Sequence, residues 1–204
     1  SGGHTTDLAG FHGTFDGQGY TVKGFKFDIG GIFGDIGKDA VIKNVAFEDC
    51  DALTEVTIPG SVSSMGYYIF ASCDSLEKVT FSEGITTTGE YMFYKCTELQ
   101  DVTLPSTLTT LANGTFEYCS AIEGITLPSD LTTIDSLAFY NCTSLKTITI
   151  PASVTEIGNS AFYNCIKITN ITLPSTLKTI KSNAFCNTSL TDISIPSSVT
   201  SIGS

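Results

Sequence analysis

Apolar residues recur along most of the chain with a period of 23 residues. The period is clearest in a column of phenylalanines at Phe70, Phe93, Phe116, Phe139, Phe162 and Phe185. Aliphatic residues keep the same spacing at Val62, Ile85, Leu108, Leu131, Val154 and Leu177, and so do prolines at Pro59, Pro105, Pro128, Pro151 and Pro174. A 23-residue unit cannot bury its own apolar face, so columns in phase predict coils that stack on one another.

One unit reads CTSLKTITIPASVTEIGNSAFYN and shows what each coil contains. The alternation at 148–150 predicts a short strand with one buried face, and Pro151 ends it because proline cannot donate to a continuing ladder. Val154 and Ile157 return to the core in a second extended segment. Residues 159–162 are expected to form a single helical turn capped by Asn or Ser.

The periodicity divides the chain into two parts. Residues 50–204 are predicted to form a β-rich leucine-rich-repeat solenoid of about seven coils, the last truncated, with one or two short parallel strands and a short helical or 3-10 turn per coil. Residues 1–49 lack the period and are rich in glycine, which predicts short strands joined by tight turns, one turn lying between 11 and 22. We expect them to form a β-helix-like cap. Because Ser204 falls inside a repeat, we also expect the natural protein to continue.

Two motifs resemble known families. The motif SLxxIxIPxxVTxIGxxAFxxC, nearly intact at Ser144–Cys165, resembles the leucine-rich repeats of the BspA-like bacterial surface proteins and extends over 50–204. The strings FxGTFDGQGYTV, GGIFG and IKNVAF resemble the GLUG motif of bacterial surface proteins. The BspA-like resemblance implies secretion or cell-surface display, adhesion to host or matrix molecules, and no catalysis.

The charge of the chain narrows the classes of partner that it can bind. The formal net charge is −11, there is no arginine, and charged residues make up only 15% of the sequence. Nucleic-acid binding needs clustered cations and is set aside, and an anionic membrane surface is disfavoured for the same reason. No stretch approaches the ~20 apolar residues of a membrane span, so we expect no membrane insertion by this segment. The expected location is extracellular or at the cell surface, with any signal and anchor outside this segment.

The cysteines and histidines give little indication of a disulfide, a metal site or a catalytic site. Cys50, Cys73, Cys96, Cys119, Cys142 and Cys165 form one column. Side chains stacked in register point the same way, which is a poor geometry for disulfides, so we interpret them as buried thiols that pack as small hydrophobes. Cys186 lies out of column and is expected to be the most exposed. The histidines, His4 and His12, lie in the N-terminal part, and we expect no catalytic residue, metal or cofactor.

Two surfaces are candidate binding sites. A column of outward threonines has variable polar neighbours, and the candidates are Glu55, Thr57, Glu77, Lys78, Thr80, Asp101, Thr103, Glu123, Thr126 and Thr149. Stacked threonines also suit a pleated sheet for structural reasons. An aromatic patch of Tyr94, Tyr118, Tyr140 and Tyr163 is the second candidate, although these rings could instead cover the phenylalanines.

The leading functional hypothesis is a non-catalytic extracellular binding or adhesion module that presents the threonine-rich face to a host or matrix protein or to a glycan. The first alternative is a structural stalk within a larger surface protein. The second is a hydrolase with its site around His12 in the N-terminal segment.

Overall fold

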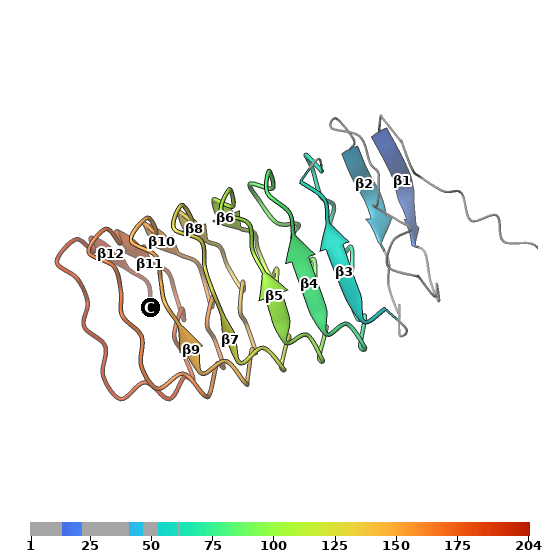
Figure 1. Cartoon of the computed structure of the whole chain (residues 1–204). Coiled ribbons are helices and arrows are strands. Elements are labelled where there is room, and N and C mark those ends of the chain that lie inside the picture. The colour runs from blue at the N-terminus through green and yellow to red at the C-terminus, as the bar shows by residue number, and fades with distance from the viewer. Residues whose placement is uncertain (1–13, 22–40, 47–52, 61) are drawn as a thin grey trace, which may run out of the picture.

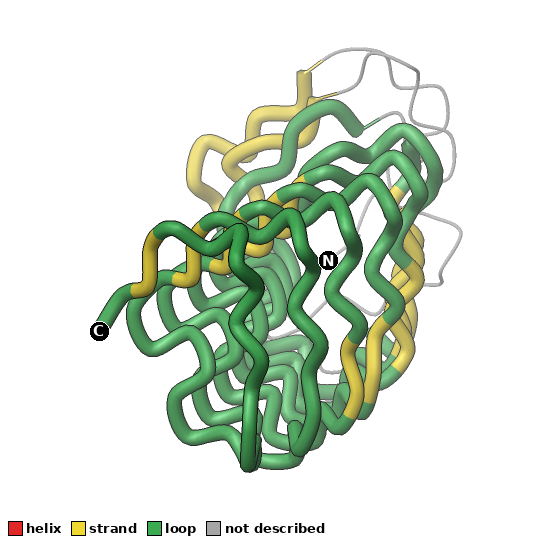
Figure 2. The backbone as a smooth tube through the Cα atoms, turned by 90° about the vertical axis from the view of Figure 1, so that its left-hand side faces the viewer, coloured by secondary structure: helices red, strands yellow, loops and turns green. Residues whose placement is uncertain are grey.

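The chain forms a row of stacked coils, as the computed structural model shows (Figure 1), and the structure describes residues 14–21, 41–46, 53–60 and 62–204. The first row of strands comprises β3 (Glu55–Ile58), β4 (Lys78–Phe81), β5 (Asp101–Thr103), β7 (Gly124–Ile125) and β9 (Thr147–Ile148). The second row comprises β6 (Thr110–Leu111), β8 (Thr133–Ile134), β10 (Glu156–Ile157), β11 (Thr179–Ile180) and β12 (Ser201–Ile202). Figure 2 shows the two rows running along the stack and joined by loops.

The paired strands run parallel, and in the repeats each pairs with its counterpart in an adjacent coil. Glu55 lies opposite Lys78, so the register equals the 23-residue period. The step shortens at the end, where Thr179 lies opposite Ser201, because the last unit is one residue shorter. The second row forms one five-stranded sheet, and the first row is divided into sheets of β3–β4–β5 and β7–β9. Sequence spacing therefore predicted the stacking correctly.

The proline column makes the corner between the two rows. In the unit with Pro151, its carbonyl accepts a hydrogen bond from the Val154 N–H at 3.1 Å, and the same bond recurs at 3.2 Å from Leu108 to Pro105. Val154 is fully buried, so the turn returns the chain to the core as the pattern predicted. Proline suits this place because it lacks the N–H that a continuing strand would need.

The core is a continuous column of phenylalanines. Ring centroids from Phe70 through Phe185 lie 5.3–5.7 Å apart, with neighbouring planes within 20° of parallel. The five rings from Phe70 to Phe162 are at most 1% exposed. Burial of this apolar surface is the dominant favourable term in forming the stack.

The expected helical turn is wrong, because the described residues contain no helix. Every second N–H of the segment donates to the next coil: Ser160 to the Ser182 carbonyl at 2.9 Å, and Phe162 to the Ala184 carbonyl at 2.8 Å. The alternate N–H groups close local turns, that of Ala161 onto Gly158 and that of Tyr163 onto Ser160. Ser160 and Asn164 also have φ of 51° and 59°, a left-handed conformation in which a right-handed helix cannot continue.

The interpretation of the cysteine column is confirmed for the coils that the structure describes. Cys73, Cys96, Cys119, Cys142 and Cys165 are fully buried, and Cys186 is exposed as predicted. The Cys119 thiol donates to the Phe93 carbonyl at 3.1 Å, and equivalent bonds recur one coil earlier and in the next two coils. Burial raises the pKa of Cys96 to about 12, so this thiol carries almost no thiolate at neutral pH.

The N-terminal part contains two described strands, β1 (Thr14–Thr21) and β2 (Val41–Ala46), which pair in parallel. The turn expected between 11 and 22 is wrong for the described residues 14–21, because β1 is one continuous strand. Its glycines coincide instead with a register shift between Asp16 and Tyr20. The predictions for His4, His12 and Cys50 fall outside the described residues.

Candidate functional site

The outward side chains of the first strand row form what we call the strand face. Thr57, Thr103, Thr126 and Thr149 are exposed there, and Thr80 is half-buried. Their neighbours in the same strands, such as Val56 and Ile125, point into the core. This alternation places the threonine column on the surface, where its hydroxyls are accessible to a ligand.

Charged residues on the strand face pair along the stack rather than within a coil. The Lys78 ammonium lies 3.5 Å from the Glu55 carboxylate, and the Lys146 ammonium lies 2.7 Å from that of Glu123. The hydrogen bond from Lys146 lowers the pKa of Glu123. Both pairs are exposed to solvent, so each adds little to stability. Their charges are therefore available to a ligand at low energetic cost.

The face is hollowed on both sides of Gly124, which occupies the column of Lys78 and Asp101 and contributes no side chain. A hollow of about 300 Å³ is lined by Lys78, Gln100, Asp101, Val102, Thr103, Gly124, Ile125 and Thr126. A second, of about 650 Å³, is lined by Gly124, Ile125, Thr126, Leu127, Ser129, Thr147, Ile148, Thr149, Pro151 and Ala152. Both are shallow and open.

The hollows bring together half of the predicted strand-face residues. Lys78, Asp101, Thr103, Thr126 and Thr149 line one or both of them. The other predicted residues do not line them: Glu55, Thr57, Glu77, Thr80 and Glu123. Sequence reasoning missed the role of Gly124, although a glycine in a column of larger polar residues was the available signal.

The second candidate surface is a chain of tyrosine rings, which we call the tyrosine ribbon. It contains the four predicted residues and two more: Tyr68, Tyr91, Tyr94, Tyr118, Tyr140 and Tyr163. Successive ring centroids lie between 4.9 and 6.5 Å apart. All six rings are partly exposed, so the ribbon is a surface as well as a cover for the core.

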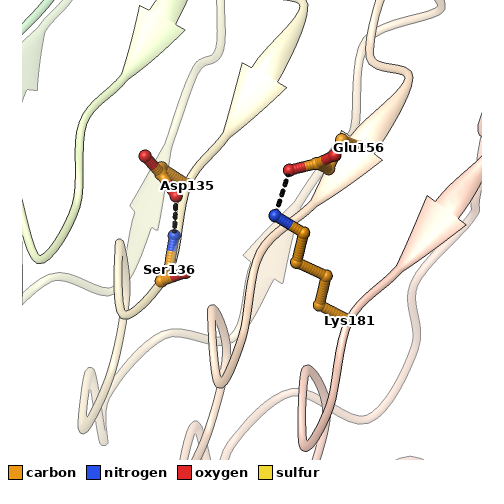
Figure 3. A network of polar contacts seen from close by, with 4 residues as sticks. All are labelled: Asp135, Ser136, Glu156 and Lys181. Atoms are coloured by element: carbon orange, nitrogen blue, oxygen red, sulfur yellow. Dashed lines mark hydrogen bonds and ion pairs between the residues drawn. The ribbon is translucent and has the colours of Figure 1, made fainter. Parts of the chain in front are cut away.

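The second strand row carries polar contacts that the sequence did not indicate (Figure 3). The Lys181 ammonium lies 2.6 Å from the Glu156 carboxylate one coil earlier, and this hydrogen bond raises the pKa of Lys181. In the next coil toward the N-terminus, the Ser136 N–H donates to the Asp135 carboxylate at 2.6 Å. Each of these polar groups has its partner within the solenoid, so the structure explains these contacts without a ligand.

Other kinds of site have no support in the described part of the chain. No three or more His, Cys, Asp or Glu side chains within it are grouped so that they could hold a metal ion. None of its segments is a helix long and apolar enough to span a membrane.

The repeats match a known family. The sequence profile described as "BspA type Leucine rich repeat region" matches residues 39–146 and 132–204, in six copies. The chain belongs to this family. The profile finds six repeats, whereas the sequence analysis predicted about seven coils, the last one truncated. No protein of curated function matches the chain in sequence.

Solved structures of bacterial proteins share the solenoid of the BspA-type family. A leucine rich cell surface protein from Faecalibacterium prausnitzii A2-165 is 34% identical, with a TM-score of 0.68, and the match covers 74% of this chain and 44% of that one. The T. pallidum leucine-rich repeat protein is 27% identical, with a TM-score of 0.70 and coverage of 80% and 77%. A leucine-rich repeat protein from Bacteroides ovatus, 23% identical with a TM-score of 0.50, shows the fold alone.

Proposed function

We propose that this BspA-type solenoid is a non-catalytic binding module of a bacterial surface, and that its strand face takes a host or matrix protein, or a glycan. The carrying observation is the pair of hollows that meet at Gly124, where predicted polar residues converge. An extracellular or surface location is part of the proposal, and its support is the likeness to a leucine rich cell surface protein.

The chemistry of the hollows suits a hydrated polar ligand. Threonine hydroxyls both donate and accept hydrogen bonds, and Lys78 and Asp101 add one charge of each sign. Ile125 lies between the hollows with only 8% of its surface exposed, so the floor is apolar but mostly covered. A floor of this kind under a rim of hydroxyls resembles the mixed character of protein interfaces.

The test fills the hollows without disturbing the fold. A Cβ on Gly124 would lie 3.2 Å from Thr147 Oγ1, a tight but tolerable approach, so Gly124→Val puts a side chain where the hollows meet. We expect the wild-type protein to bind at least one matrix protein or glycan on an array, and Gly124→Val to reduce that binding about tenfold. Thr155→Val, at an exposed position outside the hollows, is the matched control.

The stalk remains the alternative, and one observation favours it. The match covers only 44% of the F. prausnitzii cell surface protein, so a repeat region of this kind can form part of a longer surface protein. Absence of binding by the wild-type protein on the array, or binding that is the same in Gly124→Val, would support the stalk over the binding module. The hydrolase alternative rests on His12, which lies outside the described residues.

A further inference from the structure

The repeat provides an internal standard, and one coil departs from it at a position of the tyrosine ribbon. Gly114 follows Tyr68 and Tyr91 in a column that continues with Leu137, Ser160 and Asn183, so tyrosine occupies that column only in the two preceding coils. Glu117 stands in the column of Tyr94 and Tyr140. The ribbon therefore carries a carboxylate in a tyrosine column, beside a residue that has no side chain.

Three side chains meet around the bare backbone of Gly114, and the Tyr91 ring lies against it. A Cβ on Gly114 would lie 2.4 Å from Cδ1 of Tyr91 and 3.2 Å from Oε2 of Glu117, so the tyrosine ring and the carboxylate both approach the bare backbone. The Asn113 amide donates to the Tyr91 hydroxyl at 3.2 Å and fixes that ring from the other side. We call Tyr91, Asn113 and Glu117, with Gly114 between them, the ribbon notch.

The notch holds two acceptors without a donor. Glu117 is only 8% exposed, and no ion pair or side-chain hydrogen bond reaches its carboxylate from the described residues. Burial accordingly raises its pKa. Asn113 Oδ1 is buried and also lacks a hydrogen-bond partner within the described chain. The Glu117 carboxylate oxygens keep some contact with solvent, because Asn113 Oδ1 is the fully buried side-chain oxygen without a partner in the described chain. Partial desolvation of a carboxylate without a donor still costs free energy, so stability alone does not explain a glutamate in a tyrosine column.

The backbone under the notch is anchored by a polar pair in the core. Thr88 and Thr115, both buried, share a hydrogen bond of 2.7 Å between their hydroxyls. The Ala112 N–H donates to Thr88 Oγ1 at 2.9 Å, and Thr115 Oγ1 donates to the Ala112 carbonyl at 2.8 Å. The segment that carries Asn113 and Gly114 is thus held at both ends, which fixes the backbone next to the Glu117 carboxylate.

The ribbon already holds one cation. The ammonium of Lys95 lies 5.2 Å from the centroid of the Tyr94 ring, within the range of a cation–π contact. Lys95 is exposed and makes no ion pair with Glu117. The tyrosine faces therefore attract positive charge, while the adjacent carboxylate still lacks a partner.

We propose that the ribbon notch binds an arginine side chain of a protein partner, with its guanidinium donating to Glu117 and lying against the neighbouring tyrosine faces. Arginine fits better than lysine, because a planar group with five donors can bond a carboxylate in two places and stack on an aromatic ring. This site is separate from the strand face and does not depend on the function proposed there.

Tyrosine emission provides the assay, because the chain has eight tyrosines, six of them in the ribbon, and no tryptophan. The probe is acetyl-Gly-Gly-Arg-Gly-Gly-amide, compared with the same peptide carrying citrulline, a neutral isostere, or lysine. We expect saturable binding of the arginine peptide and about tenfold weaker binding of the citrulline peptide, since a hydrogen bond to a charged group is lost.

Glu117→Gln is expected to weaken arginine binding about tenfold, whereas Glu98→Gln, which removes the same charge at an exposed site, should change it less than about twofold. Circular dichroism checks that both variants fold. Tyr140→Leu, which keeps the carboxylate but removes a ring, should also weaken binding. Gly124→Val should have no effect, which separates this site from the strand face.

Three results would overturn the proposal. Equal losses in Glu117→Gln and Glu98→Gln would mean that only the net charge matters. Equal binding of the citrulline and arginine peptides would mean that the guanidinium charge is not recognised. Lysine-peptide binding as tight as that of arginine would mean that the planar geometry of the guanidinium is not recognised either.

Discussion

Removal of one central ring from the phenylalanine column should destabilise the solenoid far more than removal of a terminal ring. Phe116 is fully buried and lies between Phe93 at 5.7 Å and Phe139 at 5.6 Å. Phe116→Ala leaves a cavity that its neighbours can fill only by breaking their own register. Phe185 is half-buried and has one ring neighbour, Phe162, at 5.5 Å.

The magnitude follows from this packing. Truncation of a buried phenylalanine to alanine costs about 3–5 kcal/mol, and each stacked pair of rings contributes about 0.5–1.5 kcal/mol beyond burial. Because Phe116 stacks on a ring at either side, Phe116→Ala should fall at the upper end of the range, about 4–5 kcal/mol. Phe185 is half-buried and stacks on a single ring, so we expect about 1–2 kcal/mol for Phe185→Ala. Because domains are stable by about 5–15 kcal/mol in total, the central variant approaches the threshold of unfolding.

Urea unfolding followed by far-ultraviolet circular dichroism measures the difference. With a denaturant dependence of about 2 kcal/mol per molar urea, the midpoint should fall by ~2 M for Phe116→Ala and by less than ~1 M for Phe185→Ala. Phe116→Leu, which keeps most of the volume, should lie between wild type and the alanine variant.

Equal midpoint shifts for Phe116→Ala and Phe185→Ala would refute the reasoning. That result would mean that the rings do not form one continuous packed column and that coils stack chiefly through their backbone ladders. A shift below about 1 M for the central variant would lead to the same conclusion.

Four further outcomes are expected. Mapping with a thiol reagent should find Cys186 modified in the native protein and Cys119 modified only after unfolding, because burial raises the pKa of Cys119 well above its ordinary value. Since burial also raises the pKa of Glu117, that group favours the fold below its unfolded pKa of about 4.3, and this contribution is lost as the pH rises through the folded pKa. Glu117→Gln should therefore raise the melting temperature at pH 7 but not at pH 3. Leu137, with φ of 58°, is strained, so Leu137→Asn should stabilise the fold by about 0.5–1 kcal/mol in thermal melts. Lys181→Ala should cost less than about 1 kcal/mol, and the cost should vanish in about 1 M salt.

Much of the fold could be predicted because its determinants lie within one repeat. Alternation at 148–150 and Ile157 located the two strands of the unit, and β9 and β10 lie close to those positions, although β9 ends at Ile148, before the end expected at Pro151. The turn at 159–162 was mispredicted for a physical reason. Its local sequence suits a helix, but Ser160 and Phe162 donate to carbonyls of the next coil. Competition from a neighbouring coil cannot be seen in a single unit.

The sequence predicted which residues lie on the candidate surfaces, but not which of them surround a hollow. Periodicity places Thr103 and Thr126 outward, because strand geometry fixes which side chains leave the core. Which of them surround a hollow depends on a side chain that Gly124 lacks. The column reasoning found Tyr94 and Tyr140 but passed over Glu117 between them, although its departure from the tyrosine column was visible in the sequence.

Departures from a column divide into two kinds, and the difference indicates where function lies. Glu156 replaces a threonine of the second strand row and Lys181 replaces a glycine, but the two side chains pair with each other, so each explains the other. Glu117 also departs from its column, yet its carboxylate and the nearby amide oxygen of Asn113 have no partner within the described chain. Tyr94 and Tyr140 occupy the same column one coil before and one coil after Glu117, so the stack accommodates tyrosine in that column. A feature that costs stability and has no partner within the described chain is best explained by a partner outside it.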